Sequence, residues 1–104
     1  MRFIIKLRFP IERGNEATAD PQFGHKMSEL LAELKVEAAY FSLVNGQRGC
    51  FLVVNLNDAS ELPRIMEPFF AWLNADGEAY PVMIPADLQK AGPYIAAAFQ
   101  KWSQ

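Results

Sequence analysis

Three polar side chains, Tyr40, Ser42 and Asn55, interrupt apolar runs of this sequence. Arg8 and Tyr80 likewise lie in segments that are predicted to be strands. An arginine supplies a fixed positive charge and a planar fork that suits a carboxylate or an enolate. Tyrosine and serine hydroxyls can donate hydrogen bonds to a developing oxyanion, and an asparagine amide can orient a substrate. We therefore predict Arg8, Tyr40 and Tyr80 as catalytic residues, and Ser42 and Asn55 as ligand contacts.

The alternative for the same residues is a structural role. In that case Arg8 pairs with an acidic residue across a subunit interface, and the tyrosines pack with their hydroxyls reaching water. Lys6 is either a charge at the rim or a further ligand contact. Phe51 and Val53 are predicted to contact a ligand through their apolar side chains.

Three other reactive side chains have no assigned role. His25 is the only histidine and lies off the apolar stripe of its predicted helix, so it is expected to be exposed. Cys50 is the only cysteine and lacks an evident neighbouring base, so it is expected to act as a small apolar residue. Arg48 is expected at a hairpin tip, either solvated or reaching a partner. One cysteine and one histidine make a metal site in one subunit implausible, and no cofactor is predicted.

Composition excludes several classes of protein. The chain has 104 residues and is predicted to be one domain over residues 1–104. Its net charge is −2 and it has no basic block, which argues against binding to nucleic acid. Charges divide the N-terminal apolar run, and no stretch approaches the roughly 18 uncharged residues of a membrane span. The predicted location is therefore the cytoplasm.

Periodicity predicts four strands and several helices. Alternation indicates a first strand over residues 2–9, and a polar segment with Gly14 and Asn15 indicates a loop over 11–20. Asp20-Pro21 is typical of a helix start. A helix is predicted over 21–36, followed by strands over 38–44 and 50–56 with a loop or bulge through Gly49. One bent helix then runs from Asp58 through Pro68 to Leu73, and an edge strand covers 78–84. The chain ends with a short turn of helix over 85–90 and a last helix after Gly92-Pro93, whose apolar stripe is Ile95, Ala98, Phe99 and Trp102.

This order predicts an α+β fold of the ferredoxin-like β-α-β-β-α-β type, with one four-stranded antiparallel sheet and an extra C-terminal helix. The parity of the strands then divides the sheet into two faces. The face under the helices receives Phe3, Ile5, Leu7, Phe9, Ala39, Phe41, Leu43, Leu52, Val54 and Leu56. The open face receives Ile4, Lys6, Arg8, Tyr40, Ser42, Phe51, Val53, Asn55, Tyr80 and Val82.

The open face is both apolar and polar. Its apolar side chains are costly to leave in water, and its charges are costly to bury unpaired. Packing against a second copy of the same face resolves this conflict, and closed two-fold dimers are the commonest oligomers. We therefore predict a homodimer whose sheets enclose a partly polar chamber. No histidine or carboxylate is expected on this face.

The element order and the segment "EAYPVMIPADL" (residues 78–88) resemble the dimeric α+β barrel superfamily, which includes small muconolactone-isomerase-like, YCII-like and antibiotic-monooxygenase-like proteins. The resemblance implies a homodimeric barrel whose cavity serves isomerases, cofactor-free oxygenases, haem-handling enzymes or simple binders. The Asn-Trp-His set of the haem-degrading oxygenases and the His-Asp pair of YCII-like members have no counterparts here.

Two functions follow from this reading. The first is a cofactor-independent isomerase or oxygenase that acts on a small carboxylated or aromatic molecule in the chamber. The second is a non-catalytic module that binds a ligand or a protein. The lack of an expected general base on the open face favours the second function.

Overall fold

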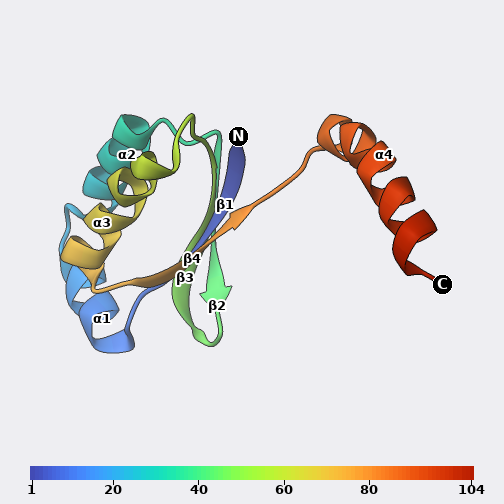
Figure 1. The fold of residues 1–104 in the computed structure, drawn as a ribbon. Helices are drawn as coiled ribbons and strands as arrows, with labels where there is room; N and C mark the ends of the chain where they lie inside the picture. Colours follow the sequence, from blue (N-terminus) through green and yellow to red (C-terminus); the bar gives the residue numbers. More distant parts are fainter.

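The computed structural model describes residues 1–104, and the chain forms a sheet, a helical layer and a separate C-terminal helix (Figure 1). Along the chain the elements are β1 (Arg2–Arg8), α1 (Ile11–Ala19), α2 (Phe23–Leu34), β2 (Ala38–Val44), β3 (Gln47–Asn55), a 3₁₀ turn (Ala59–Glu61), α3 (Leu62–Leu73), β4 (Asp76–Pro81) and α4 (Pro85–Trp102). None of these helices is long and apolar enough to cross a membrane.

The four strands form one sheet in the order β2-β3-β1-β4, and every neighbouring pair is antiparallel. Helices α1, α2 and α3 cover one face of this sheet, and α4 stands on the other side (Figure 1). The predicted α+β class and the single four-stranded antiparallel sheet are confirmed. The strand order is the one expected for the ferredoxin-like arrangement.

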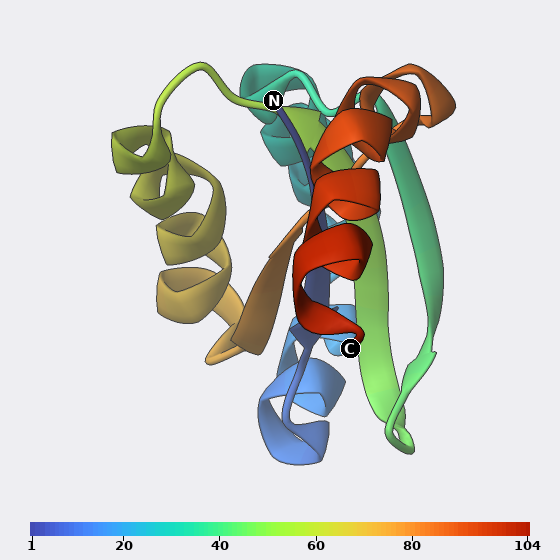
Figure 2. The same ribbon diagram turned by 45° about the vertical axis from the view of Figure 1, so that its right-hand side comes forward.

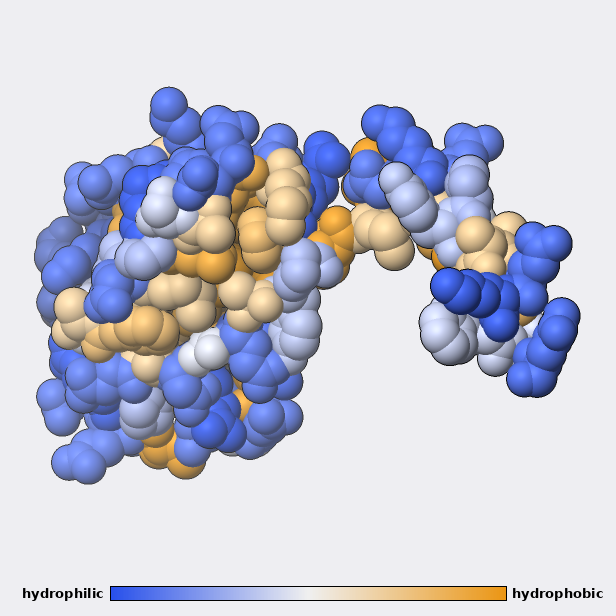
Figure 3. Space-filling view, in the orientation of Figure 1, coloured by the Kyte–Doolittle hydropathy of each residue, from blue (hydrophilic) through white to orange (hydrophobic).

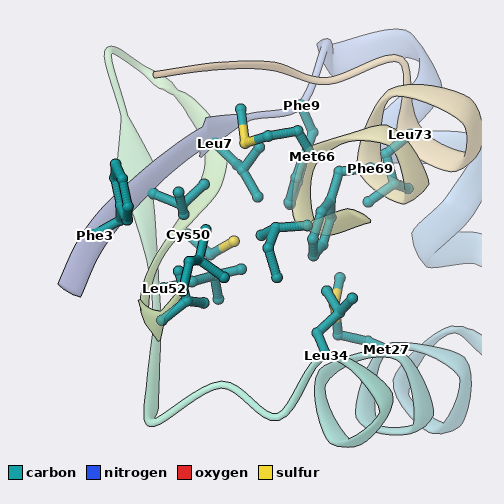
Figure 4. Close-up of a cluster of buried hydrophobic side chains, with 14 of the residues drawn as sticks. Phe3, Leu7, Phe9, Met27, Leu34, Cys50, Leu52, Met66, Phe69 and Leu73 are labelled. Atoms are coloured by element: carbon teal, nitrogen blue, oxygen red, sulfur yellow. The ribbon is translucent and has the colours of Figure 1, made fainter. Parts of the chain in front are cut away.

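The core lies between the sheet and the three helices. Phe3, Ile5 and Leu7 alternate with half-buried residues along β1, as expected for a strand with one covered face. Leu52 and Val54 continue this layer on β3, and the helices add the buried residues Met27, Leu34, Ile65, Phe69 and Leu73. Figure 4 labels Phe3, Leu7 and Leu52 of the strands and Met27, Leu34, Phe69 and Leu73 of the helices, whose side chains meet between the two layers.

Two residues assigned to the covered face are exposed, and a third, Ala39, is only half-buried. Phe41 lies in register with Cys50, and Leu43 with Arg48, so their parity is as predicted. Their side chains are nevertheless 56% and 72% exposed. Because β2 is an edge strand, the helical layer leaves this part of it uncovered.

The loop predicted over 11–20 is wrong, because residues Ile11–Ala19 form helix α1. Gly14 and Asn15 have weak helix propensity, so the local sequence does not predict this helix. Packing stabilises it instead. Gly14 and Ala17 are buried, the Arg13 side chain donates a hydrogen bond to the Trp72 carbonyl (2.8 Å), and the Thr18 hydroxyl donates to the Gly14 carbonyl (2.9 Å).

The second helix begins later than Asp20-Pro21 predicts. Asp20 terminates α1, and its Oδ1 accepts a hydrogen bond from the Gln22 N–H at 2.9 Å. This side chain therefore stabilises the turn between two helices, and α2 starts at Phe23. An aspartate before a proline suits such a turn as well as a helix start, because its side chain can accept from the backbone two residues on.

The β2–β3 connection is tighter than predicted. Asn45 and Gly46 have φ values of 50° and 82°, and β3 begins at Gln47. Positive φ at both positions is the geometry of a two-residue hairpin turn. Gly49 lies inside the ladder, opposite Arg8 and Ser42, so the loop or bulge predicted through it is absent.

The helix predicted across Pro68 is confirmed as a single element, α3. The Asp58 side chain accepts a hydrogen bond from the Ser60 N–H, and the Glu61 side chain accepts from the Asn57 and Asp58 N–H groups. These backbone donors favour the charged carboxylates and hold the pKa of both residues below its usual range.

The C-terminal segment differs from the prediction in two respects. The last strand runs from Asp76 to Pro81. The Val82 N–H still donates to the Arg2 carbonyl at 3.0 Å, and the chain leaves the sheet after this residue. The short turn and the last helix are one helix, α4, with Pro93 inside it. The apolar stripe keeps its phase across Pro93, from Leu88 through Ile95 to Trp102.

Candidate functional site

The open face of the sheet carries side chains in rows that run across the strands. The central row joins Tyr40 on β2, Phe51 on β3, Lys6 on β1 and Glu78 on β4. Residues in register lie on the same face of a sheet, so these four side chains share the open face. The row contains a cation, a carboxylate, a phenol and an apolar ring.

A second row contains the other charged pair. It joins Ser42, Gly49, Arg8 and Asp76. The Arg8 Nη2 donates to Asp76 Oδ2 at 2.7 Å, and this contact raises the pKa of Arg8 above its ordinary value. Asp76 thus binds one nitrogen of the guanidinium group that the sequence assigns to a ligand.

A third row is mostly apolar and contains the remaining tyrosine. It joins Ala38, Val53, Ile4 and Tyr80. Every predicted site residue of β1, β2 and β4 therefore lies on the open face, as do Phe51 and Val53 of β3. Asn55 is in register with Arg2 at the end of the sheet, and its Oδ1 accepts a hydrogen bond from the N-terminal amine at 2.7 Å.

The predicted catalytic residues share a face but are not neighbours. Tyr40 and Tyr80 lie on the two edge strands, three strand spacings apart, which is about 14 Å. Arg8 lies between them, in a different row from either tyrosine. One subunit therefore does not bring Arg8, Tyr40 and Tyr80 to one point.

The expectation that the open face lacks carboxylates is wrong. Glu78 and Asp76 both lie there, because β4 begins at Asp76 and pairs with β1. Parity could have revealed Glu78, since it is two residues before Tyr80 on the same strand. Asp76 was hidden because the Asp-Gly pair at positions 76 and 77 is atypical of a strand.

A pocket of about 200 Å³ lies on this face between the hairpin end of β2 and strand β4. Its lining is mostly charged or polar. The lining residues are Lys6, Arg8, Val44, Asn45, Asp76, Gly77 and Glu78.

The three reactive residues without an assigned role lie elsewhere. His25 is exposed on α2, with its Nε2 2.9 Å from Glu29 Oε1. Arg48 donates to Asn15 Oδ1 at 2.8 Å, so it links the hairpin to α1. Cys50 is fully buried on the covered face, and this burial raises the pKa of its thiol to about 12. A thiol that keeps its proton at neutral pH is a poor nucleophile.

No group of three or more histidine, cysteine, aspartate or glutamate side chains is placed to hold a metal ion. The polar groups of the open face are instead a lysine, an arginine–aspartate pair, a glutamate and two tyrosines. Such groups can bind an organic anion and move a proton.

Comparison with known protein families identifies the family of this chain. A family model described as "Domain of unknown function (DUF3303)" matches residues 1–102. The chain belongs to the DUF3303 family. No curated protein matches it. The description of DUF3303 names no activity, so the role of this DUF3303 chain has to be argued from the chemistry of its open face.

Proposed function

We propose that the protein is a homodimer whose two open sheet faces enclose a chamber that binds a small organic anion, carboxylated or aromatic. The observation that carries this proposal is the state of Lys6. Its ammonium group has no carboxylate within salt-bridge distance, although it lies in the middle of the face.

Comparison with the other basic residues of β1 shows why Lys6 stands out. Arg2 pairs with Glu37 at 2.9 Å, and Arg8 pairs with Asp76 at 2.7 Å. Lys6 lies between them on the same face and forms no salt bridge, although Glu78 is its neighbour on β4. When a second sheet covers this face, an unpaired cation becomes costly unless an anion accompanies it. An organic carboxylate satisfies that requirement.

The surroundings of Lys6 indicate the rest of the ligand. Phe51 is next to it across the β1–β3 pair, and Tyr40 lies beyond Phe51 in the same row. These rings offer flat apolar surface on which an aromatic group can stack. Val53 adds apolar surface, and Ser42 and Asn55 are proposed as hydrogen-bonding contacts. This set suits a ring or short carbon skeleton that carries a carboxylate.

A thermal-shift screen with aromatic acids and lactones, followed by calorimetric titration of the best binder, tests this proposal. Lys6→Met is expected to weaken binding about 10- to 100-fold, since a hydrogen bond to a charged group contributes about 1.5–3 kcal/mol. Lys6→Arg should keep most of the affinity.

Lys35→Met is the matched control for that experiment. It is the same substitution at an exposed lysine that follows α2, away from the open face, and it should bind as the native protein does. If no acid binds, or if Lys6→Met binds as tightly as the control, the proposed anion site is wrong.

A second candidate function is catalysis in the same chamber, because Glu78 lies in register with Lys6. A cofactor-independent isomerase and a cofactor-independent oxygenase both need a base that removes a proton from the substrate. Glu78 supplies the base that such a step needs, and Tyr40 or Tyr80 could donate a proton back. Arg8 would assist the anion only after release from Asp76.

Catalysis predicts that a bound acid is consumed, which NMR spectroscopy of the ligand can follow. Loss of a general base lowers turnover about 100- to 10,000-fold, so Glu78→Gln should stop consumption while binding persists. A ligand that binds and remains unchanged over days would instead assign the protein to the non-catalytic binders.

A further inference from the structure

Helix α4 is the one α-helix that contributes nothing to the core. None of its residues is buried, and it stands apart from the body on the side opposite α1, α2 and α3 (Figures 1 and 2). The molecule is consequently elongated, with principal extents of 59 × 27 × 21 Å and a radius of gyration of 17.5 Å. A compact chain of this length has a radius of gyration of about 13 Å.

The exposed helix carries a continuous apolar seam. Its members recur every three or four residues, as in a helix that packs against a partner. The seam consists of Leu88, Ala91, Ile95, Ala98, Phe99 and Trp102. Phe99 is 69% exposed and Trp102 is 76% exposed. The opposite side of the helix presents Lys90 and Ala97. Lys101 lies at the border of the seam, with its Nζ 5.1 Å from the centroid of the Trp102 ring.

The segment that leads to α4 is also apolar and exposed. Met83 is 61% exposed, and Ile84 is 38% exposed. Figure 3 shows apolar atoms at the junction between the body and the helix. Residues 82–84 and α4 are together called the arm below. Its large apolar side chains each offer on the order of 100 Å², so the arm approaches the roughly 800 Å² that one partner contributes to a standard interface.

The body has an apolar patch that lacks a cover, on edge strand β2. Phe41 and Leu43 are 56% and 72% exposed on the side of the sheet that faces the helices. Phe41 also lines a mainly apolar pocket of about 160 Å³ together with Phe9, Phe23 and Leu73. The patch and the arm are two different apolar surfaces of one chain. Each is exposed to solvent, and each could be covered by the apolar side chains of the other.

We infer that the arm of each subunit packs on the β2 edge of a second copy of this chain. Two such contacts related by a two-fold axis close the dimer and bury both surfaces. The exchange adds to the face-to-face contact of the sheets, and it rests on the homodimer of the proposed function. The connection favours exchange, because Pro81 and Pro85 restrict the backbone on both sides of residues 82–84.

Sedimentation equilibrium of the full-length protein and of single variants tests this inference. The native protein should be a dimer. Phe99→Glu on the arm and Leu43→Glu on β2 should each raise the dimer dissociation constant about 30-fold or more, because a buried charge disrupts an interface hot spot.

Ala97→Glu is the matched control, since it places the same charge on the opposite side of α4. It should leave the dissociation constant unchanged. Both arm variants should retain the native circular dichroism spectrum, because α4 has no buried residue.

The outcomes separate this inference from the proposed function. A native monomer, or a dimer that Phe99→Glu leaves intact, overturns the exchanged arm. Weakening by Phe99→Glu alone, with Leu43→Glu unchanged, overturns the β2 edge as the docking surface. Loss of acid binding in Lys6→Met with the dimer intact supports the anion site and shows that Lys6 is not needed for the contact between subunits.

Discussion

Raising the pH from 9 to 12 is expected to lower the free energy of unfolding by about 3 kcal/mol through Cys50 alone. The thiol is fully buried between Leu7 and Phe41 in register, and burial raises its pKa from the ordinary 9.0 to about 12. In this range the unfolded chain loses the thiol proton while the folded chain keeps it. The unfolded state thus binds fewer protons, and stability falls as the pH rises.

Chemical unfolding of the native protein and of Cys50→Ala at several alkaline pH values measures this effect. The native protein should lose about 1.4 kcal/mol more per pH unit than the variant does. Lysine and tyrosine titration is common to both proteins and cancels in the comparison. Parallel stability curves for the two proteins, or rapid labelling of Cys50 by a thiol reagent in the folded state at pH 8, would contradict the prediction.

Gly49→Ala is expected to destabilise the fold by about 3 kcal/mol, at the upper end of overpacking costs. A Cβ at this position would overlap the Leu7 carbonyl oxygen and would lie 2.6 Å from Val44 Cγ2. Leu7 belongs to the central strand, so it can retreat only by disturbing the ladder between β1 and β3. Val44 is 3% exposed and is held over the glycine by the tight hairpin.

Gly24→Ala provides the control for the glycine prediction. Gly24 lies in α2, and a Cβ there meets nothing within 4 Å. Alanine is favoured over glycine in a helix by about 1 kcal/mol, so this variant should be as stable as the native protein or more stable. Equal stability of the two variants in urea unfolding would show that the close approach at Gly49 relaxes without cost.

Predictions that depend on alternation along one strand were accurate. Lys6, Arg8, Tyr40, Ser42, Phe51, Val53 and Tyr80 all lie on the open face, as the sequence predicts. Side-chain direction alternates along a strand whatever the strand pairs with, so this property can be read from the chain itself. Helices α2 and α3 were predicted for a similar reason, because apolar residues recur every three or four positions along them.

Predictions that depend on contacts between distant segments failed. Helix α1 has a weak local signal and forms because Gly14 and Ala17 pack and Arg13 reaches the Trp72 carbonyl. The pairing of Arg8 with Asp76 depends on the register of β4 against β1, and those residues are 68 positions apart. Neither contact has a signature within a window of a few residues.

The sequence by itself determined the fold class, the two faces of the sheet and the apolar stripes of the helices, because each follows from a local period of two or of 3.6 residues. Only the tertiary structure decided that Asp76 forms an ion pair with Arg8, that Glu78 lies beside Lys6 on the open face, and that α4 leaves the body with its seam exposed. These features arise from strand register and from the path of the chain after β4, and long-range packing sets both.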